Sequence, residues 1–338
     1  MEKKCDILPV ELKEQLNDTV LWEYDLPAVK VQVVQGGYKI ETRSGPRFLK
    51  VTQSDPEAIM LADAGIRYLI KQGFSQVSPF ILTKYGDAFV RLNDHTYYLT
   101  KWIKGKELQL GRWSHLEEAV ATLARMQASA KGFMPPMVPT RESWGLWPDF
   151  FSLRLLELEE CLKLAETKDR PSEFDILFLS EADQVLEQAR ITLEMIVDSP
   201  YQELVEEARA EGSLCHHDYT GRNLIRTRGK GVYVVNFDNC QLDIHLFDLA
   251  ELFARVLPCY GWDLDLTRNL LITYNKELYL DPRHLEVLMA YLSFPQRFWQ
   301  ISRAYYLEGE PNSQEHIHSL RQVLLELPLH QDFIQQCL

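Results

Sequence analysis

The chain has 338 residues, which exceeds one typical domain and favours two compact lobes of unequal size. Hydrophobic residues make up 46% and charged residues 25%, enough apolar material for a buried core and unlike the composition of a disordered chain. The formal net charge of −13 repels nucleic-acid phosphates and anionic membranes. We therefore expect no nucleic-acid or membrane partner, and any nucleotide needs a local positive pocket.

The cysteines and the N-terminus indicate a reducing compartment. No CxxC pair or zinc-type spacing is present, which predicts reduced, mostly buried thiols. The first residues, MEKKCDILPVELKEQL, lack the apolar stretch of a signal peptide, and no window approaches the roughly 20 apolar residues that span a bilayer. The expected location is cytoplasmic. The cysteines are Cys5, Cys161, Cys215, Cys240, Cys259 and Cys337.

The N-terminal third predicts a small antiparallel sheet with one helix. Residues 28–51 alternate apolar and polar side chains between turn signals, as in a meander of three strands. Residues 54–74 place their apolar side chains on one helical face. Two strand-like runs follow at 80–86 and 88–103. The order predicts a five-stranded sheet in an N-terminal lobe over residues 1–104.

Caps and turns refine these boundaries. Gly36-Gly37 indicates a hairpin turn rather than a phosphate-binding loop. Ser54 or Asp55 is expected to cap the first helix, which Gly73 ends. Ser114 with Glu117 has the spacing of a capping box, which predicts that a second helix begins there.

The rest of the sequence predicts a larger helical lobe over residues 105–338, which carries a short hairpin. A helix is expected over 113–133, a packed loop over the Pro- and Trp-rich segment 134–148, and helical structure over 150–198. Helices return after residue 245. The aromatic stretch 294–306 is expected to be core rather than a ligand cage.

The most informative motif is the spacing His216-x-Asp218-x4-Asn223 in a polar loop before a predicted hairpin. In phosphoryl transfer from ATP, a carboxylate accepts or orients the proton of the attacking hydroxyl, and an amide oxygen a few residues later ligates the metal. This assigns Asp218 as the catalytic base and Asn223 as a ligand of Mg²⁺, with His216 in the hydrogen-bond framework of the loop.

A second acidic metal ligand is expected at the end of the following strand. There the chain reads Asn236-Phe237-Asp238, so an amide stands where a carboxylate is expected. Asp238 faces the same side as Asn236 if the strand continues, so both are candidate metal ligands.

Each of these residues also has a plainer interpretation. His, Asp and Asn are common loop residues that satisfy backbone groups. His216 with His217 lacks further ligands at zinc spacing. Cys215 ends an apolar stretch, which is typical of a small buried side chain rather than a nucleophile.

Taken together, the motifs resemble the aminoglycoside/choline phosphotransferase superfamily. The matches are His216-His217-Asp218 with Asn223, Asn236-Phe237-Asp238, and Asp248-Leu249-Ala250. Closer similarity is to bacterial spore-coat-associated kinase-like proteins of the CotS and YutH type, through YKIETRSGPRFLKV, YYLTKWIKGKEL, LARMQASAKGF, LCHHDYTGRNLI and FPQRFW. The resemblance implies a two-lobed protein-kinase-like α+β fold that binds ATP and Mg²⁺ between its lobes, over Lys50 and under the segment 102–105.

The resemblance also assigns the phosphate-binding residues. Lys50 corresponds to the lysine that pairs with the α- and β-phosphates, although a solvent-facing lysine at a strand end is the plainer alternative. The helix after it should supply an acidic partner, Asp63, or else Glu57; a solvated helix-face charge is again the alternative.

Three departures from the family pattern bear on activity. No GxGxxG loop is present, His217 stands where the family has glycine, and Asn236 removes a negative charge from the expected metal site. Two functions therefore remain open. The first is a kinase-like, nucleotide-binding spore-coat protein that transfers phosphoryl to an unknown hydroxyl. The second is a catalytically degenerate coat component, a pseudokinase. Either would be deposited in the coat among other coat proteins.

Overall fold

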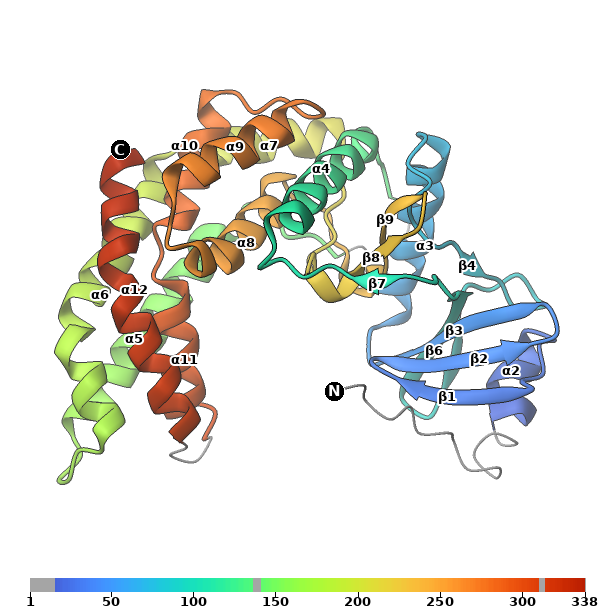
Figure 1. Ribbon diagram of the computed structural model, residues 1–338, viewed down its shortest axis with the longest axis horizontal. Coiled ribbons are helices and arrows are strands. Elements are labelled where there is room, and N and C mark those ends of the chain that lie inside the picture. Colours follow the sequence, from blue (N-terminus) through green and yellow to red (C-terminus); the bar gives the residue numbers. More distant parts are fainter. Residues whose placement is uncertain (1–15, 136–140, 310–313, 338) are drawn as a thin grey trace. The chain divides into compact units, whose positions relative to one another are not determined.

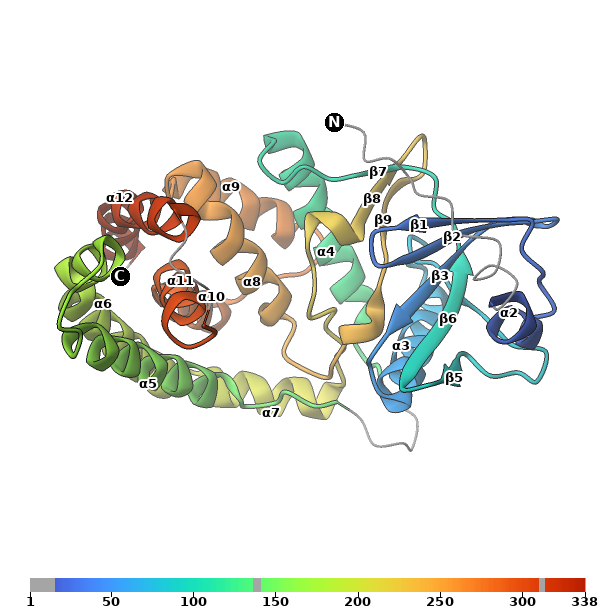
Figure 2. The same ribbon diagram turned by 90° about the horizontal axis from the view of Figure 1, so that it is seen from below.

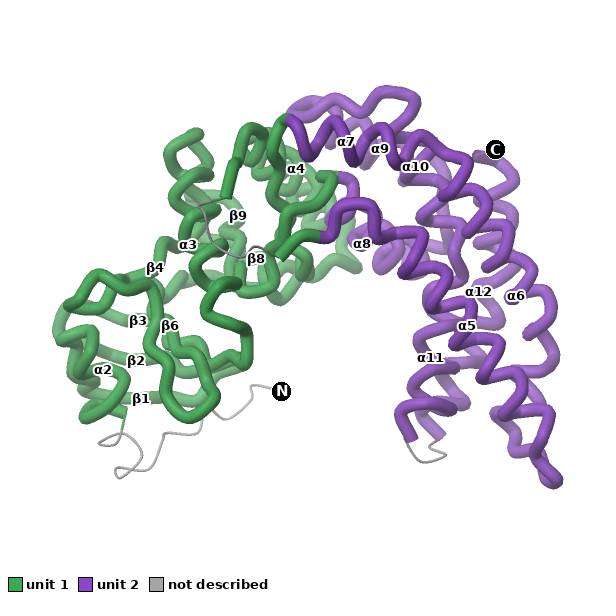
Figure 3. The backbone as a smooth tube through the Cα atoms, turned by 180° about the vertical axis from the view of Figure 1, so that it is seen from behind, with its two compact units in different colours: residues 1–142, 211–245 green, residues 143–210, 246–338 purple. Residues whose placement is uncertain are grey.

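The computed structural model describes residues 16–135, 141–309 and 314–337. The chain divides into two compact units, coloured separately in Figure 3. Unit 1 comprises residues 1–142 and 211–245, and unit 2 comprises residues 143–210 and 246–338. Antiparallel sheets and helices occupy different parts of the chain, which confirms the predicted α+β class. The lobe boundary at residue 104 stays a prediction.

Unit 1 is built on an antiparallel sheet with strand order β1-β2-β3-β6-β4, and β5 pairs with β6 (Figure 1). Tight turns join β1 to β2 and β2 to β3; Gly36 has φ +79° in the first, which confirms the predicted hairpin turn. The strands are β1 (Lys30–Val34), β2 (Gly37–Thr42), β3 (Gly45–Thr52), β4 (Phe80–Ile81), β5 (Val90–Leu92) and β6 (His95–Lys101).

The prediction of five strands was wrong because one predicted run contains two strands. Within residues 88–103 the chain reverses at Asn93 and Asp94, whose φ angles are 47° and 55°. A two-residue hairpin needs positive φ at both central positions, which Asn and Asp tolerate better than other side chains. The run therefore folds as the hairpin of β5 and β6.

The two faces of this sheet carry different side chains. Leu49 and Leu99 face each other across β3 and β6 and are fully buried, and they pack in one cluster with Leu21 of α2 (Val20–Glu23). Because successive side chains alternate, Lys50 and its cross-strand neighbour Tyr98 lie on the opposite face. The alternation thus assigns one face to the core under α2 and the other to the candidate site.

Helix α3 (Pro56–Lys71) begins and ends as predicted. Asp55 occupies the N-cap position, although its side chain makes no capping hydrogen bond; proline is the first helical residue, and Gly73 has φ +95° directly after the C-cap. Figure 2 shows α3 beside β3 and β6.

The capping box predicted for the next helix was wrong. Helix α4 (Trp113–Ala130) begins after Arg112, which makes no side-chain cap. Ser114 is therefore the second residue of the helix, two positions past the N-cap, where it no longer has the extended conformation from which a side chain caps the first turn.

A small three-stranded sheet completes unit 1. It has the order β7-β8-β9, with β7 (Lys106–Glu107), β8 (Leu224–Thr227) and β9 (Gly231–Val234). The predicted hairpin is formed by β8 and β9, which are joined by residues 228–230. Short 3-10 turns flank it at Gly221–Asn223 and Phe237–Asn239.

Unit 2 is entirely helical among its described residues. The helical prediction for 150–198 holds except at 167–172, where a Pro-containing turn separates α5 from α6, and α6 begins with a capping box of Ser172 and Asp175. Sequence reasoning did not predict α7. The helices are α5 (Trp147–Glu166), α6 (Glu173–Asp198), α7 (Tyr201–Glu211), α8 (Leu246–Val256), α9 (Leu264–Asn275), α10 (Pro282–Leu292), α11 (Gln296–Tyr306) and α12 (Gln314–Cys337), with a 3-10 turn at Leu257–Tyr260.

Aromatic stacking ties the helices of unit 2 together. Phe178 of α6 stacks on Phe298 of α11 at 5.3 Å between ring centroids, and both rings are buried. This confirms a core role for part of the aromatic stretch 294–306. Among the described residues, no helix combines the length and apolar character needed to cross a membrane.

The cysteines that the structure describes are all free thiols. Cys161, Cys215 and Cys240 are buried, Cys337 is partly buried, and Cys259 is exposed. Cys5 lies outside the described residues. The prediction of reduced, mostly buried thiols is thus confirmed for the described cysteines.

Replacing Leu99 with alanine tests the core beneath α2. Because Leu99 is fully buried in that cluster, Leu99→Ala should lower the free energy of unfolding by about 2–5 kcal/mol. Val33→Ala, on the same sheet but with 42% of its side chain exposed, should cost less than about 0.5 kcal/mol. Denaturant unfolding measures both, and equal losses would contradict this description of the core.

Candidate functional site

The predicted base and metal ligand are hydrogen-bonded to each other. The amide Nδ2 of Asn223 donates to Oδ2 of Asp218 at 2.7 Å and to the backbone carbonyl of Asp218 at 2.8 Å. Asn223 is buried, whereas Asp218 is partly exposed. A single tight turn therefore brings both groups together, as the motif spacing predicted.

His216 holds this turn from beneath. Its Nδ1 accepts a hydrogen bond from the backbone N–H of Asp218 at 3.2 Å, and its Nε2 lies 3.0 Å from the carbonyl oxygen of Val235. A neutral ring that accepts at Nδ1 and donates at Nε2 satisfies both contacts. His216 thus has the framework position predicted for it.

Asn236 joins the same hydrogen-bond chain. Its Nδ2 donates to Oδ1 of Asn223 at 2.7 Å, so an amide proton occupies the oxygen that a metal ion would otherwise approach. The strand does not continue as the sequence interpretation required, because β9 ends at Val234 and Asn236 adopts a left-handed conformation with φ 63°. We call the chain Asp218–Asn223–Asn236 the amide relay.

Asp238 contacts Lys50 instead of the amide relay. The Nζ of Lys50 lies 3.9 Å from Oδ2 of Asp238, and the hydroxyl of Tyr98 donates to Oδ1 of Asp238 at 3.2 Å. Burial, reinforced by the Asp238 charge, raises the pKa of Tyr98 well above its ordinary value, so this hydroxyl stays protonated. The lysine and the carboxylate predicted from distant motifs therefore meet.

Asp63 does not meet Lys50 among the contacts of the described residues. Its Oδ2 accepts from Nε of Arg67 at 2.8 Å, one turn further along α3. The acidic partner of Lys50 is Asp238, and a nucleotide-binding role for Asp63 stays a prediction.

A cavity of about 210 Å³ opens beside these residues, entirely within unit 1. Aromatic and aliphatic side chains of the sheet line it together with Trp102, Ile103 and Gly105, the segment under which the sequence placed the nucleotide. Asn236, Arg222 and Gln35 are among its polar lining residues. Its apolar lining includes Phe48, Ile66, Phe80, Tyr98, Ile103, Ile225 and Val234.

Sequence reasoning missed several lining residues. Tyr98 reads as an ordinary strand residue, and only its stacking on Phe80 at 4.6 Å and its bond to Asp238 single it out. Arg222 sits inside the motif, directly before Asn223, and this position was the one available signal.

His217, which stands in place of the family glycine, points its ring to a buried carboxylate. It has φ 57°, a conformation that costs a residue with a Cβ more than it costs glycine. Its Nε2 lies 3.1 Å from Oδ2 of Asp243, and both side chains are buried. The ring thus anchors the loop outside the amide relay.

The candidate metal ligands do not fit Mg²⁺ well as they stand. Mg²⁺ prefers carboxylate oxygens, but two of the three candidates are amides that bond to each other, and the single carboxylate is engaged by Lys50 and Tyr98. No cluster of three His, Cys, Asp or Glu side chains suited to a metal occurs in the described part of the chain.

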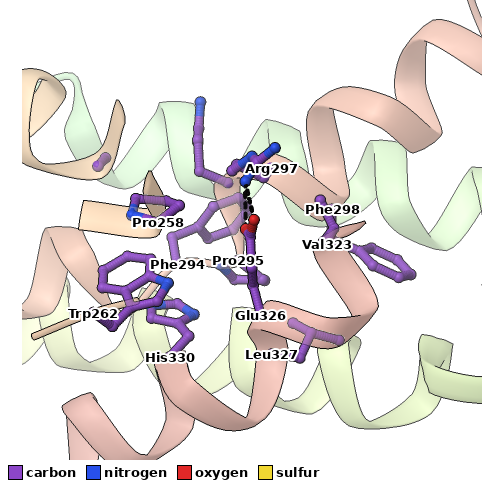
Figure 4. Close-up of a pocket in the computed structure, with 12 residues that line it drawn as sticks. Pro258, Trp262, Phe294, Pro295, Arg297, Phe298, Val323, Glu326, Leu327 and His330 are labelled. Carbon is purple, nitrogen blue, oxygen red and sulfur yellow. Dashed lines mark hydrogen bonds and ion pairs between the residues drawn. The ribbon is translucent and has the colours of Figure 1, made fainter. Parts of the chain in front are cut away.

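A second cavity, in unit 2, is too small for a substrate. It measures about 30 Å³, which matches the share of one water molecule. Figure 4 shows the ion pair of Arg297 with Glu326 and the stacked rings of Trp262 and His330 in its wall. It is a packing gap rather than a site.

With the geometry in place, comparison with solved structures defines the class of protein. The chain superimposes on an aminoglycoside phosphotransferase from Alicyclobacillus acidocaldarius with TM-score 0.83 and 21% identity, covering 99% of this chain and 96% of that one. Spectinomycin phosphotransferase APH(9)-Ia superimposes with TM-score 0.62 and 14% identity, covering 99% of this chain and 100% of that one. The fold is therefore the two-lobed, kinase-like phosphotransferase fold.

The family follows from sequence comparison. Residues 21–337 match the family described as "Spore coat putative kinase YutH", and the chain belongs to that family. Spore coat protein S of Bacillus subtilis (strain 168) is 26% identical over 306 residues, covering 88% of this chain and 86% of that protein. These findings confirm the resemblance drawn from the motifs.

Acidification tests the buried histidine beside the small cavity. Burial lowers the pKa of His330 from its ordinary 6.5 to about 4, while its ring bonds to the carbonyl of Leu292 at 2.7 Å. Between these values the unfolded chain binds more protons than the folded one, so stability falls as the pH falls from 6.5 to 4, by at most about 3 kcal/mol from this group.

Unfolding measured across this pH range checks the assignment. His330→Gln should flatten the pH dependence, whereas His318→Gln, at an exposed position, should leave the slope unchanged. An unchanged slope in His330→Gln would show that this ring is not the titrating group.

Proposed function

We propose that this chain is a nucleotide-binding, kinase-like protein of the spore coat in which phosphoryl transfer is attenuated. The observation that carries the proposal is the amide relay, in which the amide of Asn236 donates to the oxygen of Asn223. The relay preserves the shape of a phosphotransferase loop while replacing a metal-binding carboxylate by a neutral group.

Nucleotide binding is supported by the cavity of unit 1. A cavity of about 210 Å³ with a largely apolar lining suits a purine ring, Arg222 supplies positive charge in that lining, and Lys50 lies across from the lining residue Tyr98 in the sheet. Spectinomycin phosphotransferase, which shares the fold, has been crystallised with ADP. ATP is accordingly the nucleotide we assign, with Lys50 at its phosphates.

The weakening of phosphoryl transfer follows from the lack of negative charge at the expected metal site. A divalent ion at Asn223 and Asn236 would have to displace a hydrogen bond of 2.7 Å and would gain no carboxylate from either residue. Asp238 would have to leave Lys50 to serve as a ligand. Mg²⁺ is therefore held weakly, and nucleotide binding proceeds largely without it.

Phosphoryl transfer to a hydroxyl is the second candidate, and one observation favours it. Oδ1 of Asp218 takes part in no hydrogen bond within the described residues, while Oδ2 is fixed by Asn223. A partly exposed carboxylate with one oriented free oxygen can position a hydroxyl and accept its proton. This is the arrangement expected of a residual kinase.

The family supports a place in the coat. We assign the chain to synthesis in the cytoplasm followed by deposition in the spore coat, with other coat proteins as partners. The match to a spore coat family supports this assignment.

ATP should stabilise the folded chain even without Mg²⁺. Ligand that binds only the folded state at 100 times its dissociation constant adds about 2.7 kcal/mol, which raises the unfolding midpoint by several degrees. Thermal unfolding with ATP in EDTA, and again with Mg²⁺, measures the effect. The shift should be nearly the same in both.

Two matched lysine variants test whether ATP binds at Lys50. Lys50→Met should remove most of the ATP shift, whereas Lys30→Met, exposed on β1, should keep it. The absence of any shift would contradict nucleotide binding, and a shift that requires Mg²⁺ would contradict the attenuated metal site.

Placing a carboxylate at position 236 should strengthen Mg²⁺ binding. Asn236→Asp removes the donor to Asn223 and places a negative charge there, so the apo chain should lose about 1–3 kcal/mol of stability. Mg²⁺ should reverse this loss and bind at least about tenfold more tightly, and release of ADP from ATP should increase.

Titration calorimetry and a coupled ADP assay measure these effects. Asp218→Asn in the Asn236→Asp background should abolish the gain in ADP release, and Asn269→Asp, exposed on α9, should change nothing. Unchanged Mg²⁺ affinity in Asn236→Asp would remove Asn236 from the metal site.

A further inference from the structure

The charges of this chain are divided unequally between its two units. Unit 1 contains 23 Lys and Arg against 21 Asp and Glu, for a net charge of +2. Unit 2 contains 13 against 28, for a net charge of −15, and the two values give the −13 of the whole chain. The excess negative charge of the chain therefore lies in unit 2, while unit 1 is close to neutral.

The positive charge of unit 1 is concentrated in one groove. This groove, of about 1340 Å³, runs along the segment between β6 and α4 and along the β8–β9 hairpin. Glu107 is the single carboxylate in its lining. Seven cationic residues line it: Lys101, Lys104, Lys106, Arg112, Arg226, Arg228 and Lys230. We call it the basic groove.

Most of these cations have no counter-charge. Arg226 pairs with Glu118 at 2.7 Å, but the other six form no ion pair within the described residues. Lys106 stands directly opposite Arg226 across β7 and β8, an arrangement that is repulsive in a sheet. Repulsion among these positive charges lowers the stability of the chain when it is alone. An anionic partner would remove that repulsion.

The nucleotide site does not account for the basic groove. Of the seven groove cations, Lys101 alone also lines the nucleotide cavity, and Arg222, the other cation of that cavity, does not line the groove. The two hollows also share Glu107, Ser78 and residues of the segment Trp102–Gly105. The basic groove therefore needs another anionic partner.

Unit 2 carries a hollow of the opposite character. It measures about 550 Å³ and lies among α6, α10 and the end of α12. Glu194, Asp198 and Glu286 line it; all three are exposed and form no ion pair within the described residues. The remaining lining is largely apolar: Ile191, Met195, Leu285, Met289, Ala290 and Cys337. We call it the acidic hollow.

We propose that the basic groove of one chain docks on the acidic hollow of a second copy. The exposed turn of the β8–β9 hairpin, with Arg228 and Lys230, enters the hollow and pairs with its carboxylates, while the apolar lining is buried beneath. Each partner supplies the unpaired charges that the other lacks.

The charges of the two units also favour one orientation of the two copies. Two copies that meet through the same unit would oppose groove to groove or one net charge of −15 to another, and both contacts are repulsive. A contact between unlike units is attractive. A contact of groove to hollow leaves the other half of each chain open to a further copy, so copies add in closed rings or in open rows.

Self-association at low salt is the first test. The wild-type chain should sediment faster with rising protein concentration, and high salt should return it to the monomer because screening shortens the range of charge attraction. Lys104→Glu, Lys106→Glu and Lys230→Glu together should weaken self-association at least about tenfold. Lys30→Glu, Lys71→Glu and Lys131→Glu, exposed cations of unit 1 outside the groove, alter the net charge equally and should retain it.

Mixing two variants tests the orientation. A chain with Glu194→Lys, Asp198→Lys and Glu286→Lys should also be monomeric alone, because its hollow is reversed. Mixed with the chain that carries Lys104→Glu, Lys106→Glu and Lys230→Glu, it still offers an intact groove to an intact hollow. Its reversed hollow and the other variant's reversed groove also carry opposite charges, so the mixture should associate although neither variant does so alone.

Several outcomes would overturn the proposal. They are a wild-type chain that stays monomeric at low salt, equal loss of association in the matched control, or a mixture that remains monomeric. Groove-dependent binding of duplex DNA by a chain that does not self-associate would assign the groove to another partner. If the Glu variants fail to fold by circular dichroism, Gln at the same three lysines provides the same test.

Discussion

The hydrogen-bond chain Asp218–Asn223–Asn236 is the constraint on which the candidate site depends. Asn223 accepts from Asn236 and donates to Asp218, so Asn223 cannot move without leaving polar groups of both neighbours unpaired. His216 fixes the same turn through the backbone of Asp218.

The function proposed above would let a phosphotransferase fold persist while its chemistry weakens. Lys50 and Tyr98 hold Asp238, and Tyr98 lines the cavity together with Phe48 and Phe80 of the sheet. On that proposal, an amide in place of a carboxylate would weaken Mg²⁺ binding and leave the lining of the nucleotide cavity unchanged.

The charge distribution adds a second property, which the hydrogen bonds of the amide relay do not set. The basic groove and the acidic hollow lie in different units, so one chain presents both halves of a contact. A coat is built from many copies of its components in contact with one another, and a bipolar component suits such an assembly. Nucleotide binding and assembly then share the segment Trp102–Gly105, which lines both the cavity and the groove.

The sequence alone determined the class, the loop and most elements of the sheet. Those features depend on local order: alternation sets the strands, spacing sets the turn from residue 216 to residue 223, and glycine marks the hairpins. Where the local signal was ambiguous, prediction failed. The reversal at Asn93-Asp94 was read as continuous strand, and Ser114 was read as a cap although the helix begins before it.

Only the tertiary structure decided which side chains meet. Lys50 pairs with Asp238, 188 positions away, rather than with Asp63, whose partner Arg67 lies one helical turn along. Tyr98 and Asp243 become part of the site through contacts that no spacing encodes. The cations of the basic groove come from segments more than 100 residues apart in the chain, and only the pairing of β7 with β8 brings them together. Such encounters depend on the path of the backbone between distant segments, which local sequence does not specify.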